Sequence, residues 1–359
     1  MIQSDRLLES FMELLRIDSP SREEEEIGKH LAKCFTGMGL DVETDEIGNV
    51  IARMDGKGEA ILLTAHMDNV KPCRGVVPVV EEGVVRSDGT TVLGSDDKAG
   101  VAIVLEVLHT IIEHELPHRP LEIVITVQEE IGLFGAKRLE ASALHSRLGI
   151  GLDAGGKPGT IIVSAPSHNR MTAVVHGKAA HAGICPEDGV SALVIAAEAI
   201  TEMELGRIDD ETTANIGSIH GGTAANMIPD RVELRAEARS RSKSKLSNQT
   251  KAMVDALQET ALKHGGTVEV LVERRYSGYT LTEDDEIVRL IMDGMRSLGV
   301  EPALIATGGG SDANVFNTAG IQVVNIGIGM ARAHTTEEYI ALSDMVSAAE
   351  IVLACVVMS

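Results

Sequence analysis

Carboxylates and histidines stand at the ends of predicted strands, or at the start of a predicted helix, in five separate segments of the chain. They are His66 with Asp68, Asp96, Glu129 with Glu130, Asp153, and His334. Imidazole and carboxylate donors without a neighbouring thiolate suit divalent zinc, cobalt or manganese. Because the carboxylates outnumber the needs of a single ion, we expect two ions that share a bridging ligand and lie about 3.5–4 Å apart.

These side chains are expected to meet at one edge of a sheet. Ligands of open α/β sheets bind beyond the carboxyl ends of the strands, which is where His66, Glu129 and Asp153 fall. Taken singly, each has an ordinary alternative: a hydrogen-bonded histidine, a solvated pair of glutamates, or an Asp-Asp helix cap. Their coincidence at one edge favours a site. His66 and Asp68 are also spaced i, i+2, so Asp68 can accept from the second imidazole nitrogen and fix the tautomer.

Two other patterns are excluded as catalytic motifs. Residues 114–118 read H-E-L-P-H and match the H-E-x-x-H pattern of zinc proteases, but Pro117 cannot lie inside the continuous helix that this motif requires. Residues 308–312 read G-G-G-S-D, without the G-K-[ST] ending of a phosphate loop or the closing Gly of a serine nucleophile elbow. We interpret the second pattern as a close backbone approach beside the active centre.

The elements that must position these residues alternate between helix and strand. Apolar spacing predicts a helix over 7–15, and S-R-E-E from Ser21 predicts a capping box for a second helix that ends near Gly37. Further strands are predicted at 60–65, 83–87, 121–127 and 148–152, and helices at 97–115 and 135–144. This alternation predicts an α/β fold with a doubly wound, mostly parallel sheet.

The alternation changes near Asn169. From there the predicted order is β-α-β-β-α-β, the ferredoxin-like split unit, with elements at 171–176, 190–204, 214–220, 232–238, 246–264 and 267–273. After Tyr276 the α/β pattern resumes, with a helix at 285–298, a strand at 321–328 and a helix at 344–357. We therefore predict a discontinuous metal-binding catalytic domain of residues 1–168 and 276–359. Residues 169–275 would form an inserted α+β lid domain.

Composition excludes several other classes of protein. The 359 residues are 44% hydrophobic and 24% charged, as in globular proteins and unlike disordered chains. A formal net charge of −22, no Trp and only four Phe argue against a nucleic-acid partner, which needs a basic face and stacking aromatics. No apolar run reaches the roughly 18–20 residues that span a bilayer. The four scattered cysteines form no C-x-x-C, so we expect a cytoplasmic protein without disulfides or membrane contact.

Seven short motifs carry a family resemblance. In chain order they are T-A-H-M-D-N-V (64–70), S-D-G-T-T-V-L-G-S-D-D-K-A-G (87–100), T-V-Q-E-E-I-G-L-F-G-A (126–136), G-L-D-A-G-G (151–156), G-K-A-A-H-A-G (177–183), G-G-T-A-A-N-M-I-P-D (221–230) and A-H-T-T-E-E-Y (333–339). The ordered set is specific and spans nearly the whole chain. It resembles metallopeptidase family twenty, the co-catalytic zinc exopeptidases, and most closely the peptidase T-like (tripeptide aminopeptidase-like) branch.

The resemblance implies two Zn²⁺ ions, for which Co²⁺ or Mn²⁺ could substitute. By this resemblance His66 and Asp153 bind one ion, His334 and Glu130 bind the other, and Asp96 bridges the two. In relatives the peptide bond after the bridging Asp is cis, so the bond that follows Asp96 is expected to be cis here.

The implied activity is hydrolysis of small peptides. A metal-bound water would attack the peptide carbonyl, with Glu129 as the general base that returns the proton to the leaving amine and Asp68 as the orienter of the first histidine. We expect aminotripeptidase activity. The alternatives are an N-acyl amino-acid deacylase or a carboxypeptidase, since the same metals hydrolyse any small amide, and a zinc-holding binding module. An intact Glu129 argues against the binding module.

The resemblance also implies three substrate contacts in the inserted domain. His181 and Asn226 match positions that contact the substrate or its tetrahedral intermediate, and Arg239 matches an arginine that grips a substrate carboxylate. Relatives often have an acidic residue soon after the Arg-Ser pair, whereas residues 240–243 here read S-R-S-K. Arg241 could therefore hold the carboxylate in place of Arg239. The lid commonly dimerises in this family, so a homodimer through the lid is expected.

Overall fold

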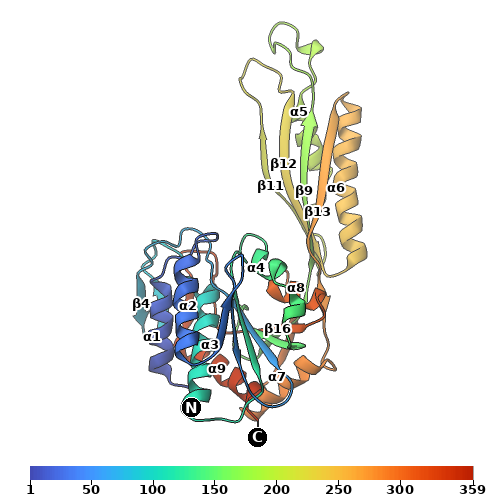
Figure 1. The fold of residues 1–359 in the computed structure, drawn as a ribbon. Coiled ribbons are helices and arrows are strands. Elements are labelled where there is room, and N and C mark those ends of the chain that lie inside the picture. The colour runs from blue at the N-terminus through green and yellow to red at the C-terminus, as the bar shows by residue number, and fades with distance from the viewer. Residues whose placement is uncertain (359) are drawn as a thin grey trace. The chain divides into compact units, whose positions relative to one another are not determined.

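The computed structural model describes residues 1–358, which form two compact units (Figure 1). The first unit comprises Met1–Val163, Leu281–Ala306 and the C-terminal part from Ser311, and the second comprises Ser164–Thr280 and Thr307–Gly310. Each unit has its own hydrophobic core.

A mixed β-sheet forms the centre of the first unit. Its strand order is β1-β2-β6-β3-β7-β16-β8-β14, with β15 paired to β8. The strands are β1 (Asp41–Thr44), β2 (Val50–Met54), β3 (Ile61–His66), β6 (Leu121–Thr126), β7 (Leu148–Gly151), β8 (Thr160–Ala165), β14 (Tyr279–Thr280), β15 (Ala303–Ala306) and β16 (Gln322–Ile326).

The direction of the strands differs from the prediction at the edges of this sheet. The central strands β6, β3, β7 and β16 are parallel, whereas the pairs β1–β2, β2–β6, β16–β8 and β8–β14 are antiparallel. The α/β class is as predicted, but the sheet is mixed rather than mostly parallel. One reason is that short connections, such as residues 45–49 between β1 and β2, cannot hold the crossover that parallel neighbours need.

Helices cover the sheet because the strands at its centre are mostly apolar. Every residue of β3 and β6 is buried, and so is most of α3, which contacts α1, α9 and β3. The helices of this unit are α1 (Ser4–Leu15), α2 (Glu25–Gly37), α3 (Ser95–Glu113), α4 (Phe134–Arg138), α7 (Glu286–Ser297), α8 (Asp312–Thr318) and α9 (Leu342–Val356). A small sheet of β17 (Tyr339–Ala341), β5 (Val84–Ser87) and β4 (Pro78–Glu81) completes the unit.

Two local predictions for this unit are wrong. The expected capping box at Ser21 does not form, because α2 begins at Glu25 and the Ser21 hydroxyl donates to Asp68 Oδ2 at 2.6 Å. The helix expected over 135–144 is shorter: α4 ends at Arg138 and only a 3₁₀ turn, Ala141–Ala143, follows. Helix α8 was not predicted. The exclusion of the H-E-x-x-H pattern is confirmed, since α3 ends at Glu113, before the first of its histidines.

The second unit contains the predicted β-α-β-β-α-β order. Its antiparallel sheet runs β10-β11-β12-β9-β13, and side chains on β9 and β12 alternate between buried and less buried positions. Contacts of α5 and α6 with β9 and β12 show that both helices lie on the buried face. The elements are β9 (Ser167–His176), α5 (Ala192–Thr201), β10 (Gly206–Arg207), β11 (Thr212–Gly221), β12 (Arg231–Ser240), α6 (Lys243–Lys263) and β13 (Thr267–Tyr276).

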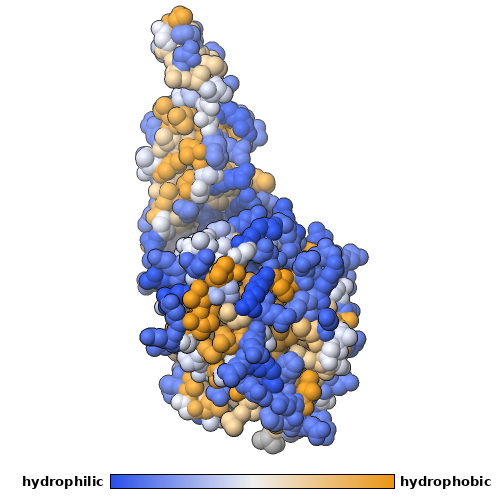
Figure 2. All heavy atoms as spheres, turned by 90° about the vertical axis from the view of Figure 1, so that its left-hand side faces the viewer, coloured by the Kyte–Doolittle hydropathy of each residue, from blue (hydrophilic) through white to orange (hydrophobic). Residues whose placement is uncertain are grey.

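Figure 2 shows a face on which hydrophilic residues surround several separate apolar patches. Within residues 1–358, no helix combines the length and the apolar character needed to cross a membrane.

Candidate metal centre

The parallel strands of the first unit bring the predicted acids and histidines together beyond their carboxyl ends. β3 ends at His66, β6 is followed by Glu129 and Glu130, and β7 is followed by Asp153. Two groups of possible ligand atoms result, each with all its atoms within 4.8 Å of one another: His66 with Asp97 and Asp153, and His66 with Asp96 and Glu130.

Asp96 lies between the two histidines. Its Oδ1 is 3.1 Å from His66 Nε2, and its Oδ2 is 3.2 Å from His334 Nε2. His334 Nε2 also lies 3.1 Å from both carboxylate oxygens of Glu130. The peptide bond between Asp96 and Asp97 is cis. A carboxylate that offers one oxygen to each of two imidazoles has the arrangement of a bridging ligand.

Glu338 holds the turn that carries Asp96. The residue is 2% exposed, and its carboxylate accepts from the backbone N–H of Gly94 (2.8 Å) and of Asp96 (3.0 Å) and from the Ser95 hydroxyl (2.5 Å). No role was predicted for Glu338. The only signal in the sequence was its place in the A-H-T-T-E-E-Y motif, which does not distinguish it from its exposed neighbour Glu337.

Asp68 connects His66 to the turn with the two glutamates. Its Oδ1 accepts from the backbone N–H of Glu129 at 2.9 Å, and its Oδ2 accepts from that of Glu130 at 3.3 Å. His66 Nδ1 is 3.0 Å from the backbone carbonyl of Asp68 and 3.5 Å from its carboxylate, so the carbonyl is the nearer acceptor. Either contact assigns the proton to Nδ1 and leaves Nε2 facing Asp96.

Glu129 is buried beside the two candidate groups. The residue is 8% exposed, and burial raises the pKa of its carboxyl well above the ordinary value, with repulsion from Asp153 and Asp312 adding to the effect and His66 opposing it. A raised pKa brings a carboxyl closer to the range in which it can both accept and return a proton during a reaction.

Asp97 and Asp312 are buried carboxylates that were not predicted. Asp97 Oδ2 accepts from the backbone N–H of His66 at 3.1 Å, and Asp312 Oδ2 accepts from the Thr126 hydroxyl at 2.5 Å. The Oδ1 atoms of both have no hydrogen-bond partner within the described part of the chain. Burial raises the pKa of Asp312 to about 6.

The close approach expected within residues 308–312 is present at Gly310. A Cβ on Gly310 would come within 2.3 Å of the ring of Tyr276, and both residues belong to the second unit. Asp312, which belongs to the first unit, is the member of this pattern that lies near the acidic cluster, as its effect on Glu129 indicates.

The donor set fits divalent cations of the zinc type. Both groups combine one imidazole with carboxylates, and neither contains a thiolate. Burial and repulsion from Asp96 raise the pKa of Asp153 well above the ordinary value. A cation placed among these carboxylates would oppose both effects and favour their ionised forms.

The predicted substrate contacts lie in the second unit, at two places. The segments of His181 and Asn226 are paired, because the N–H of Ala182 donates to the Asn226 carbonyl at 3.0 Å. This pairing lies close in the chain to the start of β12 at Arg231. Arg239 is near the other end of β12, roughly 26 Å from Arg231 for eight residues at about 3.3 Å each.

Arg239 already has an acidic partner. Its Nε and Nη2 lie 3.0 Å from the two carboxylate oxygens of Glu237, which also contacts His168 Nε2 at 3.1 Å. Contacts with His168 and Arg239 lower the pKa of Glu237 to about 2. Arg241 is partly exposed, and its Nη2 donates to the carbonyl of Asp210 at 2.9 Å in an exposed hydrogen bond.

Comparison with known proteins gives a consistent result. Residues 62–357 match the sequence profile of Peptidase family M20/M25/M40. A tripeptidase from Staphylococcus aureus is 42% identical and superposes with a TM-score of 0.95, covering 99% of this chain and 98% of that one. Aminopeptidase PepT from Bacillus cereus is also 42% identical, with a TM-score of 0.91 and the same coverage. Peptidase T of an Exiguobacterium species is 26% identical over 97% of this chain and 96% of its own length.

The geometry makes a prediction for the protein without metal. Hydrogen bonds to Asp96 and Glu130 raise the pKa of His334 from 6.5 to about 10, so its ring should stay protonated through neutral pH. Nitrogen-15 NMR of the metal-free protein, recorded across neutral and alkaline pH, measures this directly. In Glu130→Gln the pKa should fall, because one of the two acidic partners is lost. A wild-type midpoint near the ordinary histidine value of about 6.5 would contradict the contacts described.

Proposed function

The chain belongs to Peptidase family M20/M25/M40, and we propose that this peptidase is an aminopeptidase that hydrolyses tripeptides. The observation that carries the proposal is the position of Asp96, with one oxygen near each of His66 and His334. The end-to-end similarity to a tripeptidase and to an aminopeptidase at 42% identity supports the choice of substrate.

The acidic cluster would hold two Zn²⁺ ions, or Co²⁺ or Mn²⁺ in their place. His66 and Asp153 are assigned to one ion, His334 and Glu130 to the other, and Asp96 to both. Asp97 is the competing ligand for the first ion, since it groups with His66 and Asp153. When bound, such ions supply Lewis acidity to a carbonyl and a water that is deprotonated near neutral pH.

Glu129 is proposed as the general base. It accepts the proton of the attacking water and gives it to the leaving amine, and its burial supports this dual use. Asp68 keeps the tautomer of His66 and holds the backbone of Glu129. His181 and Asn226 are assigned to the oxyanion that develops on the substrate, where donors are most effective in catalysis.

We assign the substrate carboxylate to Arg239. Because both arms of its guanidinium fork face Glu237, a substrate carboxylate must either displace Glu237 or bind the remaining Nη1. Arg241 is the alternative, and its exposed guanidinium has no carboxylate partner among the contacts described.

Residues 169–275 are proposed as a lid and dimerisation domain. A tripeptide spans at most about 11 Å, whereas Arg231, where β12 begins after the loop with Asn226, lies roughly 26 Å from Arg239. This length favours two copies, rather than one, as the source of both sets of contacts for one small peptide. This supports a homodimer in which a second copy completes the substrate site.

The alternatives within the family are an N-acyl amino-acid deacylase and a carboxypeptidase, which use the same chemistry on other amides. A zinc-holding binding module would not need Glu129. A cytoplasmic location is also proposed, supported by four cysteines that are all free, as is usual in a reducing compartment.

The proposed activity is tested with one tripeptide in three forms: unblocked, N-acetylated and C-terminally amidated. The aminopeptidase should cleave the unblocked form and release its N-terminal residue, while acetylation should abolish cleavage. Chromatography of the products identifies the bond that is cut. Preferred cleavage of the acetyl group would indicate a deacylase, and release of the C-terminal residue would indicate a carboxypeptidase. Cleavage of none of them by the zinc-loaded protein would favour the binding module.

The roles of the adjacent glutamates are separated by matched substitutions. Glu129→Gln removes the base but no proposed ligand, so it should keep both metals and lose at least about 100-fold in kcat. Glu130→Gln should lose affinity for one metal, with activity partly restored by added zinc. Metal content and kcat are measured for both variants. Loss of metal in Glu129→Gln, together with normal metal content in Glu130→Gln, would reverse the two assignments.

A further inference from the structure

The segment Ser19–Glu24 lies against the turn that carries Glu129. We propose that this segment positions the general base, with Ser21 and Glu24 as positioning residues. The inference rests on the proposed function, because it takes Glu129 to be the base. It assigns a role in the reaction to a stretch whose sequence was interpreted as the start of a helix.

Three consecutive backbone N–H groups of the turn are held by carboxylates from other parts of the chain. The N–H of Gln128 donates to Glu24 Oε1 at 3.0 Å, and those of Glu129 and Glu130 donate to Asp68. Gln128 has a φ of +54°, a left-handed conformation that is uncommon for this residue type. Such a conformation persists where the surroundings fix it, and Glu24 supplies the bond at this residue.

Ser21 supports the same turn through Asp68. Its hydroxyl donates to Asp68 Oδ2 at 2.6 Å, on the oxygen that also accepts from Glu130. Ser19 fixes the segment beside this point, since its hydroxyl donates to the Met67 carbonyl at 2.7 Å and its carbonyl accepts from Asn69 N–H at 2.9 Å. Both carboxylates that hold the turn are therefore bonded to, or part of, one short segment.

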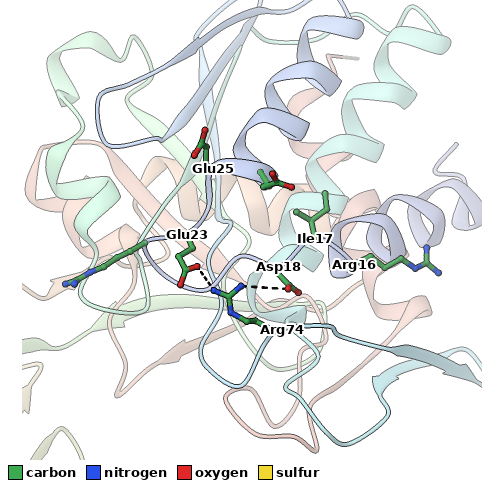
Figure 3. A pocket seen from close by; sticks show the side chains of 8 residues that line it. Arg16, Ile17, Asp18, Glu23, Glu25 and Arg74 are labelled. Carbon is green, nitrogen blue, oxygen red and sulfur yellow. Dashed lines mark hydrogen bonds and ion pairs between the residues drawn. The ribbon is translucent and has the colours of Figure 1, made fainter.

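The segment also borders a polar cavity of about 670 Å³, whose lining includes Asp18, Glu23 and Arg74 (Figure 3). In this view Arg74 points between Asp18 and Glu23 and forms ion pairs with both. These side chains are largely exposed, so the pairs are expected to add little to stability.

Glu23 and Glu24 thus form a natural matched pair. They are adjacent in sequence, but the side chain of Glu23 is 52% exposed and points to the cavity, whereas Glu24 is 6% exposed and reaches the catalytic turn. If the segment positions Glu129, only the inward glutamate should affect the reaction.

The test compares Glu24→Ala, Glu24→Gln and Ser21→Ala with the control Glu23→Ala. Glu24→Ala should lower kcat by about 10- to 100-fold, because small displacements of a catalytic group are costly, while KM and the metal content stay within about twofold of wild type. Glu24→Gln keeps an oxygen for the Gln128 N–H and should recover most of the rate. Ser21→Ala should give a smaller loss, and Glu23→Ala none.

Amide hydrogen exchange of residues 127–133 provides a readout that does not depend on activity. Exchange should be faster in Glu24→Ala and Ser21→Ala and unchanged in Glu23→Ala. Normal exchange and normal kcat in a folded Glu24→Ala would overturn the proposal. A fall in kcat accompanied by a loss of bound metal and a rise in KM would overturn it too. If Glu24→Ala does not fold, Ser21→Ala decides: normal exchange and normal kcat in this variant would overturn the proposal. A wild-type protein that cleaves no peptide would refute the proposed function, whereas the exchange data would still decide whether the segment holds the turn.

Discussion

The carboxylate of Asp68 is the contact on which the geometry of the acidic cluster depends. This carboxylate is fully buried and accepts hydrogen bonds from the Ser21 hydroxyl and from the backbone N–H groups of Glu129 and Glu130. The backbone carbonyl of Asp68 accepts from His66 Nδ1. Burial alone would raise the pKa of Asp68, but the contacts with His66 and Ser21 hold this pKa below its ordinary value. Asp68 thereby links the ends of β3 and β6, because its ionised carboxylate holds the turn of the proposed base and its backbone carbonyl holds the first histidine.

The second constraint is the accumulation of negative charge at this edge of the sheet. Asp96, Glu130 and Asp153 converge on His66, and buried carboxylates at such distances disfavour the ionised state of one another. Glu338 adds a further carboxylate behind Asp96, where three hydrogen bonds stabilise it. Divalent cations would relieve this repulsion, so that metal binding and the stability of the first unit are expected to be coupled.

The sequence predicted those features that depend on local pattern. His66, Glu129 and Asp153 follow apolar runs, and the structure places His66 at the last position of β3 and the other two just after β6 and β7. The sequence did not predict the features that depend on tertiary contacts. Glu24 and Glu338 resemble surface glutamates in the sequence, and only the folded chain shows which backbone N–H groups they receive. Ser21 has the local pattern of a helix cap, but the distant Asp68 takes its hydroxyl. The antiparallel edge strands were missed for a similar reason, since strand direction is set by connections and partners rather than by composition.

The central claim is that Asp96 bridges two metal ions at the edge of this sheet. Crystals of the zinc-loaded protein, measured on both sides of the zinc absorption edge, test it most directly. The account predicts two anomalous peaks per chain, about 3.5–4 Å apart, with one oxygen of Asp96 on each. A single peak, or two peaks joined by Asp97 with Asp96 outside their coordination, would contradict it.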